Sequence, residues 1–178
     1  MSCFIIISEE NKGVKILEFS KNKMLDELDC NILHILQTEG QLNNSEIAKR
    51  VNLSPPATHT RIKRLEAEGY ITNHVAILNQ EKLGFDLLSF IFMSTNIHQQ
   101  EKLEVLERKL KSMPEILECQ CITGEYDYLL KVANKDRKEL ENFIRKLNSL
   151  GITRIQTSLA LREIKYSTAL PIWDDENR

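Results

Sequence analysis

Two apolar stripes with the same internal spacing limit most strongly what this chain can fold into. In each stripe the apolar residues stand at +3, +7 and +10 from the first one, and the second stripe starts 37 positions after the first. The stripes are Leu103, Leu106, Leu110 and Met113, and Leu140, Phe143, Leu147 and Leu150. Strand-like segments flank both stripes, at 87–97, 116–123, 126–132 and 152–166. The order strand, helix, strand therefore occurs twice, which predicts a ferredoxin-like βαββαβ domain.

Several of these strand segments, notably 87–93 and 128–132, are apolar on both faces. Two helices can cover only one face of a four-stranded sheet. We therefore expect the other face to meet a partner subunit in a homodimer or a higher oligomer.

The first half of the chain predicts three short helices. The first starts after Asp26 and stops before Gly40, the second spans about 44–51 behind an asparagine N-cap, and the third spans about 55–68 behind Ser54. The inner face of the third helix is Thr58, Ile62 and Leu65. Two short helices joined by a short turn predict a helix-turn-helix (winged-helix-like) domain, and residues 71–78 after it predict a strand. The whole chain is thus an α+β protein.

One segment of the chain is basic although the net charge is −2. Between Ile47 and Leu65 there is no Asp or Glu, and the cations are Lys49, Arg50, Arg61, Lys63 and Arg64. In a helix-turn-helix this pattern favours phosphate contacts with double-stranded DNA over a merely solvated face. Base contacts are expected from the start of the third helix, so the predicted DNA-binding set also includes Ser54, Pro56, Ala57, His59 and Thr60. Arg61 has an equally weighted alternative, a clamp to the first helix through an acid such as Asp29.

Four motifs in register resemble the Lrp/AsnC family of feast/famine transcriptional regulators. They are Leu25-Asp26-x-x-Asp29-x-x-Ile32-Leu33, Ser45-Glu46-Ile47-Ala48, Leu53-Ser54-Pro55 with Arg61-Ile62-x-Arg64-Leu65-Glu66-x-x-Gly69-x-Ile71, and Thr123-Gly124-Glu125-Tyr126-Asp127-Tyr128-Leu129-Leu130. The resemblance covers about 25–166. It implies a DNA-binding domain joined to a ligand-sensing ferredoxin-like domain that pairs through its sheets, and a response to amino acids or related metabolites. The chain departs from the family pattern at Thr58, where an aliphatic residue is usual, and at the additional Pro56.

The resemblance also implies an effector site near the dimer interface, at Thr123, Gly124, Glu125, Tyr126, Asp127 and Tyr128. There Gly124 would let backbone amides approach a carboxylate, and Asp127 would accept an ammonium group. The alternative is a plain hairpin in which Asp127 hydrogen-bonds the turn.

Other functional classes find little support in the sequence. The longest apolar runs are far shorter than the roughly 20 residues that span a bilayer, and the N-terminus does not look like a secretory signal, so we expect a cytoplasmic protein and no membrane partner. The four cysteines lack C-x-x-C spacing, and Cys119 and Cys121 are expected to be core or interface residues; no metal, cofactor or catalytic residue is predicted. The chief alternative is a tetrapyrrole (siroheme) decarboxylase-like enzyme on the same fold.

The predicted domain boundaries follow the glycines and the composition. Residues 1–23 form a tail, 24–70 the DNA-binding domain, 71–83 a strand linker, 84–166 the effector-binding and oligomerisation domain, and 167–178 a C-terminal tail. One hypothesis makes Met24 the biological start, which the intact mass of the natively expressed protein would test. Trp173 is expected to anchor the C-terminal tail.

Overall fold

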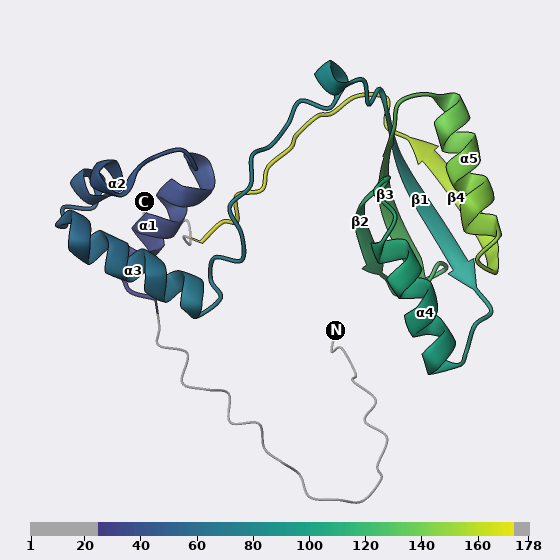
Figure 1. Cartoon of the computed structure of the whole chain (residues 1–178), viewed down its shortest axis with the longest axis horizontal. Helices are drawn as coiled ribbons and strands as arrows, with labels where there is room; N and C mark the ends of the chain where they lie inside the picture. The colour runs from purple at the N-terminus through teal and green to yellow at the C-terminus, as the bar shows by residue number, and fades with distance from the viewer. Residues whose placement is uncertain (1–24, 173–178) are drawn as a thin grey trace, which may run out of the picture. The chain divides into compact units, whose positions relative to one another are not determined.

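The computed structural model describes residues 25–172 and divides the chain into two units (Figure 1). The sheet unit is Val75–Ser167, and the helical unit comprises the chain up to His74 together with the segment that begins at Thr168. The expectations about residues 1–23, Met24 and Trp173 lie outside the described residues.

The helical unit contains the three helices that the sequence predicts. They are α1 (Glu27–Thr38), α2 (Asn44–Arg50) and α3 (Pro55–Ala67). Asp26 and Asn43 close capping boxes at the starts of α1 and α2, and the Ser54 hydroxyl accepts the N–H of Ala57 at the start of α3. One backbone N–H in the first turn of each helix is therefore bonded by the N-cap side chain three residues earlier.

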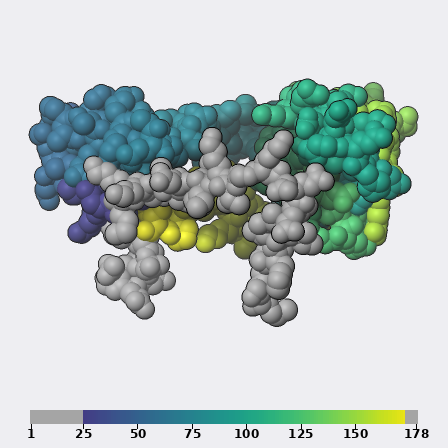
Figure 2. Space-filling model, turned by 90° about the horizontal axis from the view of Figure 1, so that it is seen from below, coloured from purple at the N-terminus to yellow at the C-terminus, as the bar shows by residue number. Residues whose placement is uncertain are grey.

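The core of the helical unit is small and apolar except at two positions, Thr58 and Asp29. Ile32, Ile47 and Leu65 are fully buried. Figure 2 shows the outer surface of this unit, with α1 to α3 coloured from purple to blue. Thr58 is also fully buried, and its Oγ1 atom has no hydrogen-bond partner. The hydroxyl is therefore desolvated without compensation.

Replacing Thr58 by valine is expected to stabilise the helical unit. Valine keeps the branched shape and removes the unpaired hydroxyl, so the free energy of unfolding should rise by about 1 kcal/mol. Slower hydrogen exchange of the core amides of α1 and α3 would report this gain. A Thr58→Val variant that exchanges faster than the wild type would contradict the prediction.

The segment after Thr168 is held against α1. The side-chain amide of Gln37 donates to the carbonyl of Leu170 and accepts the N–H of the same residue, both at 2.9 Å. The last described residues therefore complete the helical unit, although most of the chain lies between them and α1.

The sheet unit has the predicted ferredoxin-like order. Its elements are β1 (Leu87–Thr95), α4 (Gln100–Lys111), β2 (Ile116–Cys121), β3 (Tyr128–Asn134), α5 (Arg137–Asn148) and β4 (Ile152–Leu159), preceded by a short 3-10 helix at Glu81–Leu83. The sheet order is β2-β3-β1-β4 with every neighbouring pair antiparallel. Both helices lie on one face of the sheet (Figure 1), where Ile91, Leu130 and Phe143 form the centre of the core.

The other face of the sheet carries no helix. Because side chains alternate along a strand, the residues between the buried core positions point to this face. Four of them, Leu88, Phe90, Phe92 and Leu129, are apolar and only half-buried. We call this surface the open face.

The structure corrects the predicted strands at several points, and β1 ends at Thr95 instead of residue 97. Residues 71–78 are not a strand, because no ladder pairs with them in the described chain and Val75, Ile77 and Leu78 are largely exposed. The last strand stops at Leu159 instead of Tyr166, where pairing with β1 ends. The hairpin loop between β2 and β3 spans residues 122–127, longer than the predicted Gly124-Glu125 turn.

Candidate DNA-binding and effector sites

The start of α3 presents an exposed surface made of the residues predicted to contact bases. Pro56, Ala57, His59 and Thr60 are all exposed. The Thr60 hydroxyl donates to the carbonyl of Pro56 at 3.0 Å, so its proton is already used within the helix. His59 therefore offers the free N–H donor on this surface.

A contact with Asn44 on α2 determines which ring nitrogen of His59 carries the proton. The side-chain nitrogen of Asn44 lies 2.9 Å from Nδ1 of His59. Because an amide NH2 group can only donate, Nδ1 accepts and the neutral ring carries its proton on Nε2. Nε2–H is thus left as a donor directed away from Asn44.

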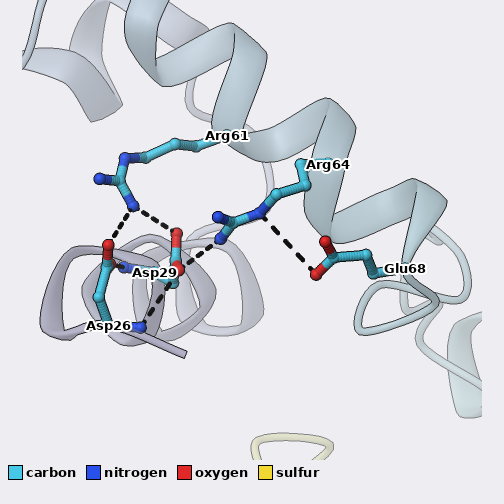
Figure 3. Close-up of polar contacts among 5 residues, drawn as sticks. All are labelled: Asp26, Asp29, Arg61, Arg64 and Glu68. Carbon is cyan, nitrogen blue, oxygen red and sulfur yellow. Dashed lines mark hydrogen bonds and ion pairs between the residues drawn. The ribbon is translucent and has the colours of Figure 1, made fainter. Parts of the chain in front are cut away.

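Two of the predicted DNA-binding arginines are engaged with α1 (Figure 3). Arg61 Nη1 lies 2.6 Å from Asp26 and 2.8 Å from Asp29, and Arg64 donates to the other oxygen of Asp29. Arg64 also lies 3.8 Å from Glu68. The structure therefore contains the clamp between α1 and α3 that was the alternative interpretation of Arg61.

Asp29 is the centre of this cluster. Its side chain is 1% exposed, and burial alone would raise its pKa. Hydrogen bonds from Arg64 and Arg61, and the N–H of Asp26, outweigh burial and hold the pKa below its ordinary value. The carboxylate is therefore ionised and shared by two guanidinium groups.

Two other cations of the basic segment also have acidic partners. Arg50 forms a two-point contact with Glu39, and Lys63 lies 2.8 Å from Glu66 one turn along α3. Lys49 has no ion-pair partner in residues 25–172. The segment is free of acids in sequence, yet folding brings acids to it from both sides. Arg50 and Lys63 remain accessible to phosphate because their pairs are solvent-exposed.

The predicted effector segment forms the loop between β2 and β3. Gly124 has φ +126°, a conformation that favours glycine. The Asp127 carboxylate accepts the N–H of Thr95 at 2.9 Å, and its own N–H donates to Met93. Asp127 thus ties the loop to β1 through Thr95, 32 positions away. Within the described residues its side chain makes no hydrogen bond to its own turn, whereas the plain-hairpin alternative expected one. Thr123 is exposed at the loop surface.

The two tyrosines of this segment point to different faces of the sheet. Tyr126 packs against Phe92 of the open face, and its hydroxyl donates to Gln156 at 2.6 Å. Arg154 lies over the Tyr126 ring and pairs with Glu125 at 2.7 Å. The structure therefore does not bring the six predicted effector residues into one pocket.

Tyr128 lies on the helix side and lines a hollow between α4 and β2. Its hydroxyl donates to Glu107 at 2.9 Å, and burial, then this carboxylate, raise its pKa, so the phenol stays protonated. The hollow has a volume of about 480 Å³ and also includes Cys119 and Cys121. These two cysteines are exposed at the edge of the sheet and do not belong to the core of this chain.

Metal and membrane sites are not found in the described residues. No group of three or more His, Cys, Asp or Glu side chains between residues 25 and 172 is arranged to hold a metal ion. Over the same range no helix is both long and apolar enough to cross a bilayer.

Sequence reasoning missed several residues that the geometry singles out. Asn44 acts through a contact across the helix-turn-helix, 15 positions from His59, which no local pattern reveals. Glu107 and Lys111 look like ordinary solvated residues of an amphipathic helix until β2 is placed beside them. Their spacing of four residues, which puts them on one helix face, was the only available signal.

Two family models match the two units. A winged helix-turn-helix DNA-binding model matches residues 25–72, and the Lrp/AsnC ligand binding domain model matches residues 88–170. The first match confirms the predicted DNA-binding class of the helical domain, and the second confirms a ligand-binding class for the sheet domain.

Individual relatives agree with these models. The chain is 37% identical over 151 residues to the DNA-binding transcriptional activator DecR of Escherichia coli K12, covering 84% of this chain and 99% of that protein. It is 36% identical over 154 residues to the leucine-responsive regulatory protein of Salmonella typhimurium LT2, covering 84% and 93%. Among solved structures it resembles the transcriptional regulator NMB0573 of Neisseria meningitidis in complex with L-Met, with a TM-score of 0.78, 35% identity, and coverage of 83% and 97%.

All three relatives are named as regulators, which confirms the prediction of a regulator rather than an enzyme and gives no support to the decarboxylase alternative. The chain belongs to the Lrp/AsnC family of transcriptional regulators.

Proposed function

We propose that this regulator binds specific operator sequences as a homodimer or larger assembly in the cytoplasm, and that an amino acid alters that binding. The observation that carries the proposal is the exposed start of α3, held on α1 by the Asp29 cluster and carrying His59 as a fixed donor. Regulators of this kind insert such a helix into the major groove.

The cations divide into two groups in this proposal. Lys49, Arg50 and Lys63 contact phosphates, since an exposed ion pair gives up its carboxylate for a phosphate at little cost. Arg61 and Arg64 set the position of α3 and contact DNA through the nitrogens that Asp29 leaves free. Ser54, Pro56, Ala57 and Thr60 form the rest of the surface around His59.

His59 is expected to read the major-groove edge of guanine. Guanine presents two adjacent acceptors, N7 and O6, whereas adenine sets a donor beside N7 and cytosine presents a donor. His59→Ala should therefore reduce discrimination at one base pair of the operator about tenfold. Asn44→Ala should weaken discrimination at the same base pair, and the double variant should add little to His59→Ala alone. Affinities for single-base operator variants measure this.

Lys63→Ala is the matched control, because a phosphate contact carries no sequence information. It should weaken binding to operator and random duplexes alike and reduce the salt slope of log affinity by about 1. If His59→Ala lowers the affinity for the operator and for a random duplex by the same factor, His59 does not contact a base.

The open face supports the dimer part of the proposal. Leu88, Phe90, Phe92 and Leu129 form an apolar surface that a second copy would cover face to face. Two copies would then present two recognition helices to half-sites about one helical turn apart.

The effector part of the proposal assigns the amino acid to the ferredoxin-like domain (84–166), with the segment Thr123–Tyr128 at the edge of its site. L-Met in complex with the related regulator NMB0573 supports this class of ligand. The domain at 24–70 binds DNA, and ligand binding acts by changing how the subunits present their helices.

Selection of genomic fragments by the purified full-length protein, with and without a mixture of amino acids, tests the whole proposal. We expect a common operator motif whose occupancy changes when the mixture is added. The proposal would be refuted if the purified protein is monomeric or does not bind duplex DNA at low salt.

A further inference from the structure

Two free thiols lie side by side on the edge strand of the sheet. Cys119 and Cys121 are two positions apart on β2, so their side chains point to the same face, and both line the hollow between α4 and β2. Their partners on β3 are Leu130 and Tyr128, which belong to the core on the helix side of the sheet. Because β2 is the edge strand (Figure 1), both thiols remain exposed to solvent.

The spacing of the two thiols favours a shared ligand over a disulfide. A strand rises about 3.3 Å per residue, so residues two apart have parallel side chains roughly 6.6 Å from each other at their Cα atoms. A disulfide requires Cβ atoms about 3.8 Å apart, and parallel side chains do not supply that approach. An atom that bonds each sulfur at about 2.3 Å leaves the sulfurs up to roughly 4.6 Å apart, which rotation about the two Cα–Cβ bonds can reach.

The hollow has room for a group that such a bridging atom carries. Its volume of about 480 Å³ falls within the range of about 300–1,000 Å³ that ligand pockets occupy. Beside the thiols its lining includes the apolar residues Leu110, Ile116 and Leu117. A ligand bonded to both sulfurs can therefore place an apolar substituent against these side chains.

The donor set favours trivalent arsenic over a metal cation. Sulfur ligands select soft partners, and a structural metal site usually has four protein donors. In residues 25–172 no group of three or more His, Cys, Asp or Glu side chains is arranged to hold a metal ion. Two protein sulfurs are enough for a trivalent arsenical, because the third bond of arsenic goes to the substituent that it already carries.

The protonation of the thiols points the same way. Partial desolvation of the sulfur, and then the charges of Glu107 and Cys121, raise the pKa of the Cys119 thiol, which is therefore protonated at neutral pH. A metal cation binds thiolates and has to displace these protons first. An arsenic–oxygen compound instead reacts with the protonated thiols and carries their protons away as water.

We propose that Cys119 and Cys121 form a dithiol site for trivalent arsenicals. When an R–As=O compound reacts with the two thiols, the bonds between arsenic and oxygen break and two As–S bonds form. The oxygen leaves as water with both thiol protons, and arsenic stays trivalent, so no oxidant or reductant takes part. The substituent R lies against Leu110 and Ile116. This site is independent of the regulatory function proposed above.

Phenylarsine oxide is the probe that tests the site. The full-length Cys3→Ser, Cys30→Ser protein, which keeps only the two thiols of β2, is mixed with one equivalent of the probe and measured by intact mass spectrometry. We expect one phenylarsenic group per chain. It should survive an about 100-fold excess of glutathione, which offers one thiol at a time, and be released by dithiothreitol, which offers two. Release by glutathione would contradict a two-sulfur bridge.

Removal of either thiol tests the bridge. Cys119→Ser or Cys121→Ser in the same background leaves a single As–S bond, so the dissociation constant of phenylarsine oxide should rise at least about 100-fold. Both side chains are exposed, and serine keeps their size, so both variants should preserve the fold. If either variant keeps the probe as tightly as the parent, the two cysteines do not act together and the proposal is wrong.

A matched control keeps two thiols on β2 but moves one to the other face. Gln120 is exposed, adjacent to Cys119, and points to the opposite side of the sheet. Gln120→Cys combined with Cys121→Ser should therefore bind phenylarsine oxide no more tightly than the single-thiol variants. If this control binds as tightly as the parent pair, the shared face is not what makes the site, and the proposal is overturned.

Discussion

Replacing Asp29 by asparagine is expected to destabilise the helical unit by about 3 kcal/mol. The variant keeps the size of the side chain but removes the buried charge that Arg61 and Arg64 share. Both guanidinium groups would then lie against a neutral amide. Hydrogen exchange of the amides in α1 and α3 should become about 100-fold faster, whereas amides of the sheet unit should not change.

An exposed ion pair offers the control. Glu39→Gln removes the charge opposite Arg50, but these side chains are 47% and 45% exposed and water replaces the contact. Exchange in α1 and α3 should stay near the wild-type rate. Equal acceleration in the two variants would show that burial of Asp29 is not what gives its ion pairs their strength.

The lowered pKa of Asp29 gives the same contact a pH dependence. A carboxyl whose folded pKa lies below its unfolded value contributes stability above the unfolded value, near 3.8, and loses it as the pH falls through the folded value. The stability difference between wild type and Asp29→Asn should therefore be constant at neutral pH and shrink below about pH 4. Denaturant titrations at several pH values measure it.

Replacing Phe90 by glutamate is expected to convert the proposed dimer to a monomer and to weaken operator binding at least 100-fold. Phe90 is half-buried at the centre of the open face. In a dimer each copy would bury an unpaired carboxylate, which costs several kcal/mol per charge. A monomer engages one half-site and loses the gain from linking two recognition helices. Light scattering and operator titrations measure the two effects.

Val105→Glu is the matched change on the opposite side of the sheet. Val105 is an exposed apolar residue of α4, 43% accessible, and a carboxylate there stays in water. Assembly and operator affinity should remain those of the wild type. If the Phe90→Glu protein is still dimeric, the open face is not the dimer interface.

The features that the sequence predicts well depend on residues that are close together in the chain. The helix starts at Asp26 and Asn43 and the inner face of α3 all depend on positions three or four apart, and all are confirmed. The repeated apolar stripes likewise specify α4 and α5. Residues 71–78 were predicted to be a strand but are not one. Local sequence can show a β-branched segment, but such a segment becomes a strand only when another strand pairs with it.

The candidate sites depend on contacts between distant residues, and there sequence predicts less. Counting charges along residues 47–65 gives a basic surface, but Asp29 reaches Arg64 from 35 positions away. The alternation of Cys119 and Cys121 predicts that they share a face, which the structure bears out at the hollow. It does not predict that β2 lies at the edge of the sheet, which is why these thiols are exposed instead of buried.

The contact between Gln37 and Leu170 has a consequence for synthesis of the protein. The two residues are 133 positions apart, so a ribosome adding about 5–20 residues per second makes the second one roughly 7–27 s after the first. The nascent helix-turn-helix must wait until Leu170 has been synthesised before these hydrogen bonds form. A nonsense mutation just past β4 would consequently remove a contact of the DNA-binding domain, although it lies far downstream of that domain in the reading frame.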